Sequence, residues 1–336
     1  MRYRRLGRSG LLVSEISLGT MTFGSQLDER TSVRIMAEAF EAGVTLFDTA
    51  EMYAVPQTPE TQGASERILG AFLKTVPRDR VIVATKVSGP GDGPGRGIVG
   101  HIRGGLCALD RFHIERAVEE SLKRLGTDVI DLYQTHWPDR VTPMDEQLEA
   151  LDRLVRAGKV RYLGVSNETP WGLTRLAARA EALGTARIVS LQNVYHLLKR
   201  VYDDGMSEVC VNEGIGMLAF SPIAMGVLTG KYGAVGGAGP EARLNAFPPR
   251  FQARYGHARA ITAADRYVAL AREHGLHPAT MAVAWTIARP GIASALPGVS
   301  RPDQLAPILA AADLDLSPDL LQAIEAVHRE MPNPVV

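Results

Sequence analysis

Short apolar runs alternate with amphipathic segments along most of the chain. The runs are rich in β-branched residues and are bounded by Gly, Pro, Asn or Asp, which is typical of strands. Several are apolar almost throughout, as expected for parallel strands that are covered by helices. The pattern predicts strands at residues 16–18, 45–47, 81–85, 130–135, 161–165, 188–191, 216–220 and 293–296.

The segments between these strands carry the helical period. Ile114, Val118, Leu122 and Leu125, for example, share one face of a predicted helix. Eight strand and helix units in about 300 residues predict a (β/α)8 TIM barrel, which right-handed crossovers close. A doubly wound sheet is the alternative, but no GxGxxG motif follows the first strand to support it.

The two ends of the chain add elements to the barrel. The segment before residue 16 predicts a β-hairpin with Arg8, Ser9 and Gly10 at its turn, and a final helix is expected from near Ser317 to about Arg329. We expect one barrel domain over residues 1–336. Two Gly-rich stretches, 88–106 and 225–240, are too long for simple connections and are interpreted as functional loops, although the pattern leaves open whether they close over a ligand.

Composition narrows the function classes. The chain has 37 Lys and Arg and 37 Asp and Glu, so no basic surplus favours nucleic acid or an anionic membrane. Cys107 and Cys210 form no CxxC, and the histidines lack HxH or HExxH spacing, so we expect neither a disulfide framework nor a metal site. Because no signal peptide or membrane-spanning apolar segment is readable, we expect a cytoplasmic protein. The sequence does not indicate its oligomeric state.

Polar residues follow every predicted strand. In a barrel of this kind, functional groups lie at the carboxyl ends of the strands. Any one of these residues could be a turn cap, but together they predict a site at one end of the barrel. They are Thr20, Asp48, Lys86, His136, Ser166, Asn167, Gln192, Ser221, Gly298 and Ser300.

Four side chains suggest a reaction. Tyr53 follows Asp48 by five residues and could share a site with Lys86 and His136. A phenol has a pKa of about 10, which an adjacent ammonium lowers, and Asp48 would orient that ammonium. Tyr53 and His136 could then stabilise an alkoxide, which predicts carbonyl reduction with hydride from a nicotinamide cofactor.

Four ordered motifs carry a family resemblance. They are "GVTLFDTAEMY", "VIVATK", "DLYQTHWPD" and "YLGVSN", and with them the chain resembles the aldo-keto reductases over essentially its whole length. Finer features such as "GVSNETPWG" are similar to bacterial Tas-type members. The resemblance implies NADPH-dependent reduction of a small aldehyde or ketone, with Tyr53 as general acid, Lys86 and Asp48 tuning it and His136 orienting the carbonyl.

The resemblance also implies binding residues. Ser166, Asn167 and Gln192 would face the nicotinamide carboxamide, Phe220 would stack on its ring, and Lys231 and Arg243 would select the 2'-phosphate. Apolar substrate walls are expected from Phe23, Met52 and Trp137. The chain departs from the family where Glu-Asn often contacts adenine, because Pro307 and Ile308 stand there. The full set of implied cofactor contacts is Thr20, Met21, Asp48, Ser166, Asn167, Gln192, Phe220, Ser221, Ile223, Gly226, Leu228, Lys231, Arg243, Gly298, Ser300 and Gln304.

Two other classes stay open at this point. Lys86 could form a Schiff base in an aldolase-type lyase, although Asp48 favours the charged ammonium. The chain could also be an NADPH-binding sensor, because channel β subunits resemble it at the Asp48, Tyr53 and Lys86 positions. Those subunits have Asn where His136 stands, which favours an enzyme.

Overall fold

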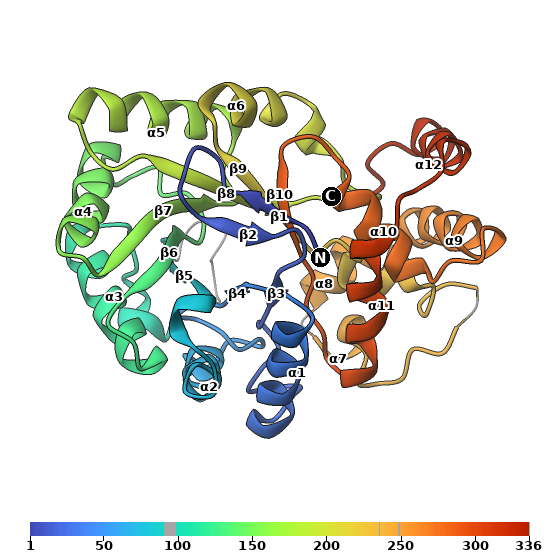
Figure 1. Ribbon diagram of the computed structural model, residues 1–336, viewed down its shortest axis with the longest axis horizontal. Helices are drawn as coiled ribbons and strands as arrows, with labels where there is room; N and C mark the ends of the chain where they lie inside the picture. Colours follow the sequence, from blue (N-terminus) through green and yellow to red (C-terminus); the bar gives the residue numbers. More distant parts are fainter. Residues whose placement is uncertain (91–98, 235, 248, 336) are drawn as a thin grey trace.

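The structure is a computed structural model that describes residues 1–90, 99–234, 236–247 and 249–335. Part of the predicted 88–106 loop therefore lies outside the described residues. Within them, eight parallel strands form one sheet in chain order (Figure 1). The strands are β3 (Leu18–Gly19), β4 (Leu46–Asp48), β5 (Ile82–Val87), β6 (Ile130–Thr135), β7 (Val160–Ser166), β8 (Ile188–Val194), β9 (Gly216–Phe220) and β10 (Ile292–Leu296).

The sheet is closed into a barrel by contacts between its first and last strands. Ile16 pairs with Ala295 and Gly19 with Gly298, both in parallel. The Ser17 backbone N–H donates to the Ala295 carbonyl at 2.8 Å, which adds a ladder bond at the seam. This closure confirms the predicted (β/α)8 barrel and rules out the doubly wound alternative.

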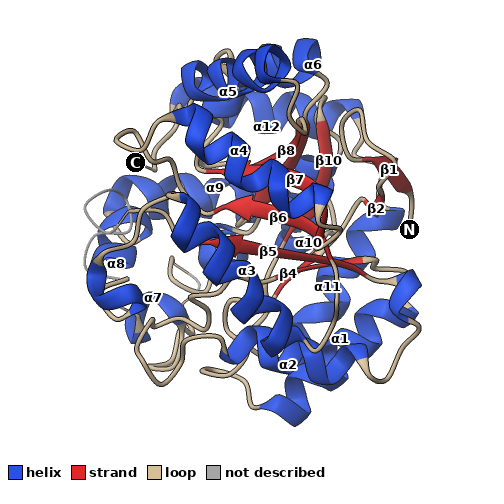
Figure 2. Cartoon of the chain, turned by 90° about the vertical axis from the view of Figure 1, so that its left-hand side faces the viewer, coloured by secondary structure: helices blue, strands red, loops and turns tan. Residues whose placement is uncertain are grey.

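An antiparallel hairpin seals the amino-terminal end of the barrel. It consists of β1 (Tyr3–Arg5) and β2 (Leu12–Ser14), and the Leu6 N–H donates to the Leu11 carbonyl across the predicted turn. Leu6, Leu11 and Val13 are buried and pack against apolar side chains inside the barrel. Figure 2 shows the hairpin at one end of the barrel and the short helices α7 (Arg243–Ala246) and α8 (Pro249–Tyr255) at the other.

Helices surround the strands and bury the outer core between the two layers. Polar N-caps start several of them: the Asp28, Asp110, Thr169 and Ser317 side chains each accept from a backbone N–H in the first turn. The remaining helices are α1 (Glu29–Glu41), α2 (Ala64–Leu73), α3 (Arg111–Leu125), α4 (Met144–Arg156), α5 (Pro170–Leu183), α6 (Met206–Glu213), α9 (Ala258–Glu273), α10 (Pro278–Ile287), α11 (Leu305–Leu309) and α12 (Pro318–Glu330).

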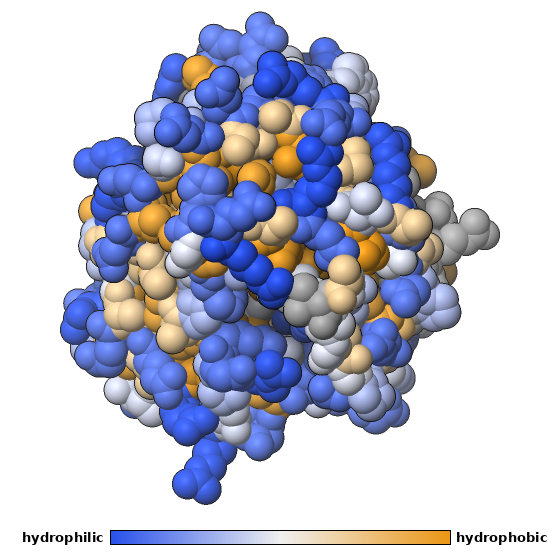
Figure 3. All heavy atoms as spheres, turned by 90° about the vertical axis from the view of Figure 1, so that its right-hand side faces the viewer, coloured by the Kyte–Doolittle hydropathy of each residue, from blue (hydrophilic) through white to orange (hydrophobic). Residues whose placement is uncertain are grey.

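The last helix confirms the predicted carboxyl-terminal element, because α12 begins directly after the Ser317 cap. The side of the molecule that carries α9 and α12 is mainly hydrophilic, with apolar areas between the hydrophilic residues (Figure 3). No helix in the described ranges combines the length and apolar character that crossing a membrane requires.

Candidate active site

A cavity of about 330 Å³ opens at the carboxyl ends of the strands, within the range of volumes typical of ligand pockets. Residues from β4, β7, β8, β9 and β10 and from the loops after them line it, so the barrel brings together segments that are far apart in the chain. The predicted site residues on its wall are Met21, Asp48, Met52, Tyr53, His136, Trp137, Ser166, Asn167, Gln192, Phe220, Ser221, Ile223, Arg243 and Gly298.

A buried ion pair lies at the base of the site. Lys86 Nζ is 2.5 Å from Asp48 Oδ2 and also donates to the Thr49 carbonyl at 2.7 Å. The Lys86 and Asp48 side chains are 1% and 3% exposed. Burial lowers the pKa of Lys86, while the Asp48 carboxylate opposes that shift. Asp48 therefore holds the ammonium in place and offsets part of its cost of burial.

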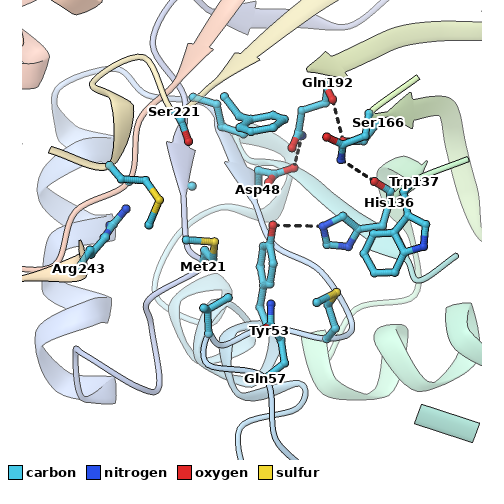
Figure 4. Close-up of a pocket in the computed structure, with 18 of the residues that line it drawn as sticks. Met21, Asp48, Tyr53, Gln57, His136, Trp137, Ser166, Gln192, Ser221 and Arg243 are labelled. Atoms are coloured by element: carbon cyan, nitrogen blue, oxygen red, sulfur yellow. Dashed lines mark hydrogen bonds between the residues drawn. The ribbon is translucent and has the colours of Figure 1, made fainter. Parts of the chain in front are cut away.

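Tyr53 and His136 face each other above this pair (Figure 4). The Tyr53 hydroxyl lies 3.4 Å from His136 Nε2, and the rings meet edge to face with centroids 5.4 Å apart. Lys86 Nζ is 5.0 Å from the centroid of the Tyr53 ring. The phenol and the imidazole can thus both reach one substrate oxygen in the cavity.

The structure changes the expected electrostatics of Tyr53. Burial raises the pKa of its phenol, and the Asp48 carboxylate raises it further. The prediction of a lowered pKa is therefore wrong as the net effect in the protein without a ligand, because burial and Asp48 outweigh the Lys86 ammonium, which is bonded to Asp48 and the Thr49 carbonyl. Tyr53 keeps its proton at neutral pH, which is the form that a proton donor needs.

His136 is neutral in this environment. Burial and the nearby Lys86 charge hold the pKa of its imidazole well below the usual value. The Asn167 side-chain nitrogen donates to the His136 carbonyl at 2.9 Å and fixes its backbone. Within the described residues His136 Nδ1 has no hydrogen-bond partner. The ring can therefore offer Nε2 to Tyr53 or to a ligand without competition from a charged state.

Gln192 lines the cavity, but its amide is engaged with the base of the site. Gln192 Nε2 donates to Asp48 Oδ1 at 2.7 Å, and Gln134 Nε2 donates to the same oxygen at 3.1 Å. Sequence reasoning missed Gln134. The signal was present, since Gln134 lies two residues before His136 and the strand period places both on one face.

Two strand ends adopt the left-handed conformation. Asn167, after β7, has φ 55°, and Ser221, after β9, has φ 57°. Asn tolerates this region better than most residues, whereas Ser at positive φ marks local strain of the kind that clusters at functional sites. The Ser166 hydroxyl donates to the Gln192 carbonyl at 2.7 Å, which joins the ends of β7 and β8.

Beneath the Tyr53 loop lies a second buried pair. His113 Nε2 is 3.4 Å from Glu51 Oε1, both side chains are fully buried, and Glu51 Oε1 accepts the Ser88 N–H at 2.6 Å. Burial opposes the charge of His113, but contacts with Cys107 and Glu51 raise its pKa to about 9. Through Glu51, the loop that carries Tyr53 is tied to α3 by His113 and to the end of β5 by the Ser88 N–H.

A neighbouring cavity of about 270 Å³ continues the first and shares Ile223, Met225, Arg243 and Gly298 with it. It is lined by predicted cofactor residues from the ends of β9 and β10, and by the two positions where the sequence departs from the pattern of the family it resembles. These are Gly226, Lys231, Ser300, Gln304, Pro307 and Ile308. Gln304 Oε1 already accepts the Ser300 N–H at 2.9 Å, so this N–H is engaged within the protein.

Lys231 and Arg243 are the cations of this cavity that fit a phosphate. Burial lowers the pKa of Arg243 to about 10, and burial together with the Arg243 charge lowers that of Lys231. Among the residues that the structure describes, neither forms an ion pair with a carboxylate, whereas the nearby Arg301 is paired with Asp303. An anion placed here would relieve two poorly compensated charges.

Four predicted site residues lie off the cavity walls. Phe23 is fully buried in the outer core, so the prediction that it forms a substrate wall is wrong. Leu228 is likewise a core residue. Thr20 lies behind the cavity wall, and its hydroxyl donates to the Asp48 backbone carbonyl at 2.9 Å. Lys86 is covered by its partners.

Several wall residues carried no sequence motif. Val55 and Gln57 come from the loop after Tyr53, and Arg254 and Tyr255 come from α8, more than thirty residues after the end of β9. No local pattern relates α8 to the strand ends. Only the folded chain brings it there.

Comparison with known proteins agrees with this architecture. The aldo/keto reductase family model matches residues 15–329. The chain is 43% identical to Protein tas of Escherichia coli over 98% of each chain, and 36% identical to the uncharacterized oxidoreductase YrpG of Bacillus subtilis over 97% of this chain and 96% of that protein. It is also 32% identical to a probable voltage-gated potassium channel subunit beta of rice, over 99% and 98% of the two chains.

Proposed function

Because the chain belongs to the aldo/keto reductase family, we propose that it reduces small aldehydes or ketones to alcohols with NADPH. Members of this family generally use NAD(P)H, and the family together with oxidoreductase relatives supports an oxidoreductase. The observation that carries the proposal is the 3.4 Å approach of the Tyr53 hydroxyl to His136 Nε2, in a cavity that lies over the Lys86 and Asp48 pair.

The four side chains take separate roles. Tyr53 donates the proton to the carbonyl oxygen, and His136 orients that oxygen through Nε2. Lys86 places positive charge beneath the Tyr53 ring, where it stabilises the phenolate that proton donation leaves. Asp48 holds Lys86 through a 2.5 Å bond.

The cavities fit a nicotinamide dinucleotide. When bound, NADPH supplies the hydride that protein side chains lack. Ser166 and Asn167 offer polar groups at the nicotinamide end, Phe220 offers an aromatic face, and Lys231 and Arg243 offer unpaired cations for the 2'-phosphate. The cytoplasmic location that the composition favours would supply this cofactor.

The lyase alternative loses support. A Schiff-base lysine must present its amine to the substrate. Lys86 is 1% exposed and its ammonium bonds Asp48 and the Thr49 carbonyl. A ligand in the cavity would meet Tyr53 and His136 first.

A sensor function rests on the likeness to the rice protein whose name is probable voltage-gated potassium channel subunit beta. A sensor would bind NADPH without needing a proton donor. The contact between Tyr53 and His136 favours the enzyme, and turnover separates the two hypotheses.

The test is NADPH oxidation with 4-nitrobenzaldehyde by wild type and Tyr53→Phe. We expect the variant to lose about 10²- to 10⁴-fold in kcat while its NADPH dissociation constant stays the same. Tyr162→Phe, which removes a hydroxyl outside the site that accepts from the Gly10 N–H, serves as the control. An unchanged rate in Tyr53→Phe would overturn the assignment of the proton donor, and absent turnover with NADPH bound would favour the sensor.

A further inference from the structure

The first cavity contains a cation that the proposed reaction does not use. Its charged wall residues are Asp48, Arg243 and Arg254. Asp48 is paired with Lys86, and Arg243 also lines the neighbouring cavity that fits the dinucleotide. Arg254 lines the first cavity but not the neighbouring one, and it is exposed, so its guanidinium stands where the first cavity meets solvent.

Tyr255 anchors this arginine to the site. Tyr255 is 1% exposed, and its hydroxyl interacts with the side chains of Arg254 and Ser221. The Arg254 guanidinium carbon lies 6.0 Å from the centroid of the Tyr255 ring. Since Ser221 follows β9 directly, these contacts attach α8 to the rim of the barrel and limit the positions that Arg254 can take.

A second cation, Lys199 in the loop after β8, is not on the wall of the first cavity but lies near enough to Arg254 for the two charges to repel each other. Lys199 is half-buried, and burial together with the Arg254 charge lowers the pKa of its ammonium. His196 is fully buried close to both cations, and its ring centroid is 5.8 Å from that of Tyr255. Burial and the charges of Lys199 and Arg254 lower the pKa of His196 to about 3, so it is neutral and adds no third charge.

These two cations have no counter-charge in the described part of the chain. No carboxylate there lies within ion-pair distance of Lys199 or Arg254, whereas Arg140 is paired with Glu168 and Arg301 with Asp303. Two like charges held together without an acid destabilise the free protein and favour an incoming anion. The remaining walls near Tyr53 are apolar, from Met52, Val55 and Trp137.

We propose that Arg254, assisted by Lys199, binds a carboxylate of the substrate, so that the preferred substrates are aldehydes or ketones that also carry a carboxylate. The inference rests on the proposed reductase function, because it places the carbonyl of the same molecule at Tyr53 and His136. A single arginine fork matches one carboxylate in a bidentate manner, and the apolar walls hold the carbon skeleton between the two ends.

The test compares two aldehydes that differ in one charge, 4-carboxybenzaldehyde and methyl 4-formylbenzoate, at saturating NADPH. We expect wild type to have a kcat/KM at least about 10-fold higher for the carboxylate. Arg254→Gln should lower kcat/KM for the carboxylate by about 10- to 100-fold, mainly through KM, and leave the ester within about 3-fold. Arg254→Lys should recover part of the loss, and Lys199→Met should show a smaller loss.

Arg259→Gln is the matched control, since it removes the same charge from an exposed arginine on α9 whose guanidinium donates to the Pro332 carbonyl. Equal kcat/KM for the two aldehydes in wild type, or equal losses for both in Arg254→Gln, would overturn the carboxylate site. So would a weaker NADPH affinity in Arg254→Gln, because it would assign the arginine to the dinucleotide.

Calorimetric binding of the same two compounds separates this inference from the reductase function. If neither aldehyde is turned over, the reductase proposal fails. The carboxylate site still stands if 4-carboxybenzaldehyde binds more tightly than the ester and Arg254→Gln removes the difference. It falls if the two compounds bind equally to wild type.

Discussion

Gln192 Nε2 lies 2.7 Å from Asp48 Oδ1, so a residue expected to face the nicotinamide carboxamide also holds the carboxylate that positions Lys86. The contact joins the end of β8 to the end of β4 across the barrel. Gln134 Nε2 donates to the same oxygen. Because both amides bind Asp48 Oδ1, Asp48 Oδ2 is the oxygen that bonds Lys86.

The hydrogen bond from Gln192 to Asp48 predicts that removing the Gln192 amide lowers the free energy of unfolding. Gln192→Leu leaves Asp48 Oδ1 with the longer Gln134 bond alone, so we expect about 1–3 kcal/mol lower free energy of unfolding in urea. Gln322→Leu on the exposed face of α12 should change it by less than about 0.5 kcal/mol. A loss below about 0.5 kcal/mol in Gln192→Leu would mean that Gln134 alone satisfies the carboxylate.

The buried pair of Glu51 and His113 predicts a pH dependence of stability. The folded-state pKa of His113 is about 9, above the ordinary value of about 6.5. Its contribution is therefore fully present below about pH 6.5 and is lost as pH rises through 9. Relative to wild type, His113→Gln should be destabilised by on the order of 2 kcal/mol more at about pH 6 than at about pH 9.5.

Urea unfolding at several pH values measures this difference. His274→Gln, which changes an exposed histidine at the end of α9, is the control and should follow the wild-type profile. A stability difference between wild type and His113→Gln that does not vary with pH would contradict the raised pKa of His113 in the folded protein.

Trp137 depends on a glycine for its position. A Cβ on Gly89 would lie 2.5 Å from Trp137 Cδ1, and the indole donates to the Pro90 carbonyl at 3.2 Å. Gly89→Ala must therefore displace the indole from the cavity wall. We expect about 1–3 kcal/mol of destabilisation and a raised KM for aromatic aldehydes.

Gly100→Ala is the matched comparison, because a Cβ there meets nothing within 4 Å. It should leave both the unfolding free energy and KM near the wild-type values. Equal behaviour of the two alanine variants would contradict the close approach of Gly89 to Trp137.

The unpaired cations of the second cavity predict a cofactor preference. Wild type should bind NADPH more tightly than NADH, measured by fluorescence titration. Lys231→Met or Arg243→Met should each reduce that preference by about 10-fold or more, by weakening NADPH alone. Equal dissociation constants for NADPH and NADH in wild type would remove the phosphate role of both residues.

The barrel was predictable because its signals are local. Each strand is a short apolar run with a polar residue at its carboxyl end, and the predicted strand at 130–135 matches β6 at both ends. Repetition of this unit specifies closure, since parallel strands with right-handed crossovers place all carboxyl ends on one side. The placement of Asp48, Tyr53 and His136 around one cavity follows from that geometry.

The features that the sequence did not predict are contacts between residues that lie far apart in the chain. Phe23 follows β3 closely, yet its ring points into the outer core, because a loop can turn a residue either way without changing the local pattern. Arg254 reaches the cavity from a helix well beyond β9. The raised pKa of Tyr53 reflects burial and the nearby Asp48 carboxylate, which depend on the whole packed site.

The hairpin that seals the barrel has an effect beyond closure. Phe220 and Leu296 line the cavity and also pack on the apolar cluster inside the barrel, which continues down to Leu6 and Val13 of the hairpin. The bottom of the cavity is thus formed by side chains of this cluster, and the cluster is supported at its other end by the amino-terminal hairpin. A large-to-small substitution deep in this cluster would let Phe220 and Leu296 move inward without removing any ligand contact. The depth of the cavity can therefore be changed from the opposite end of the barrel.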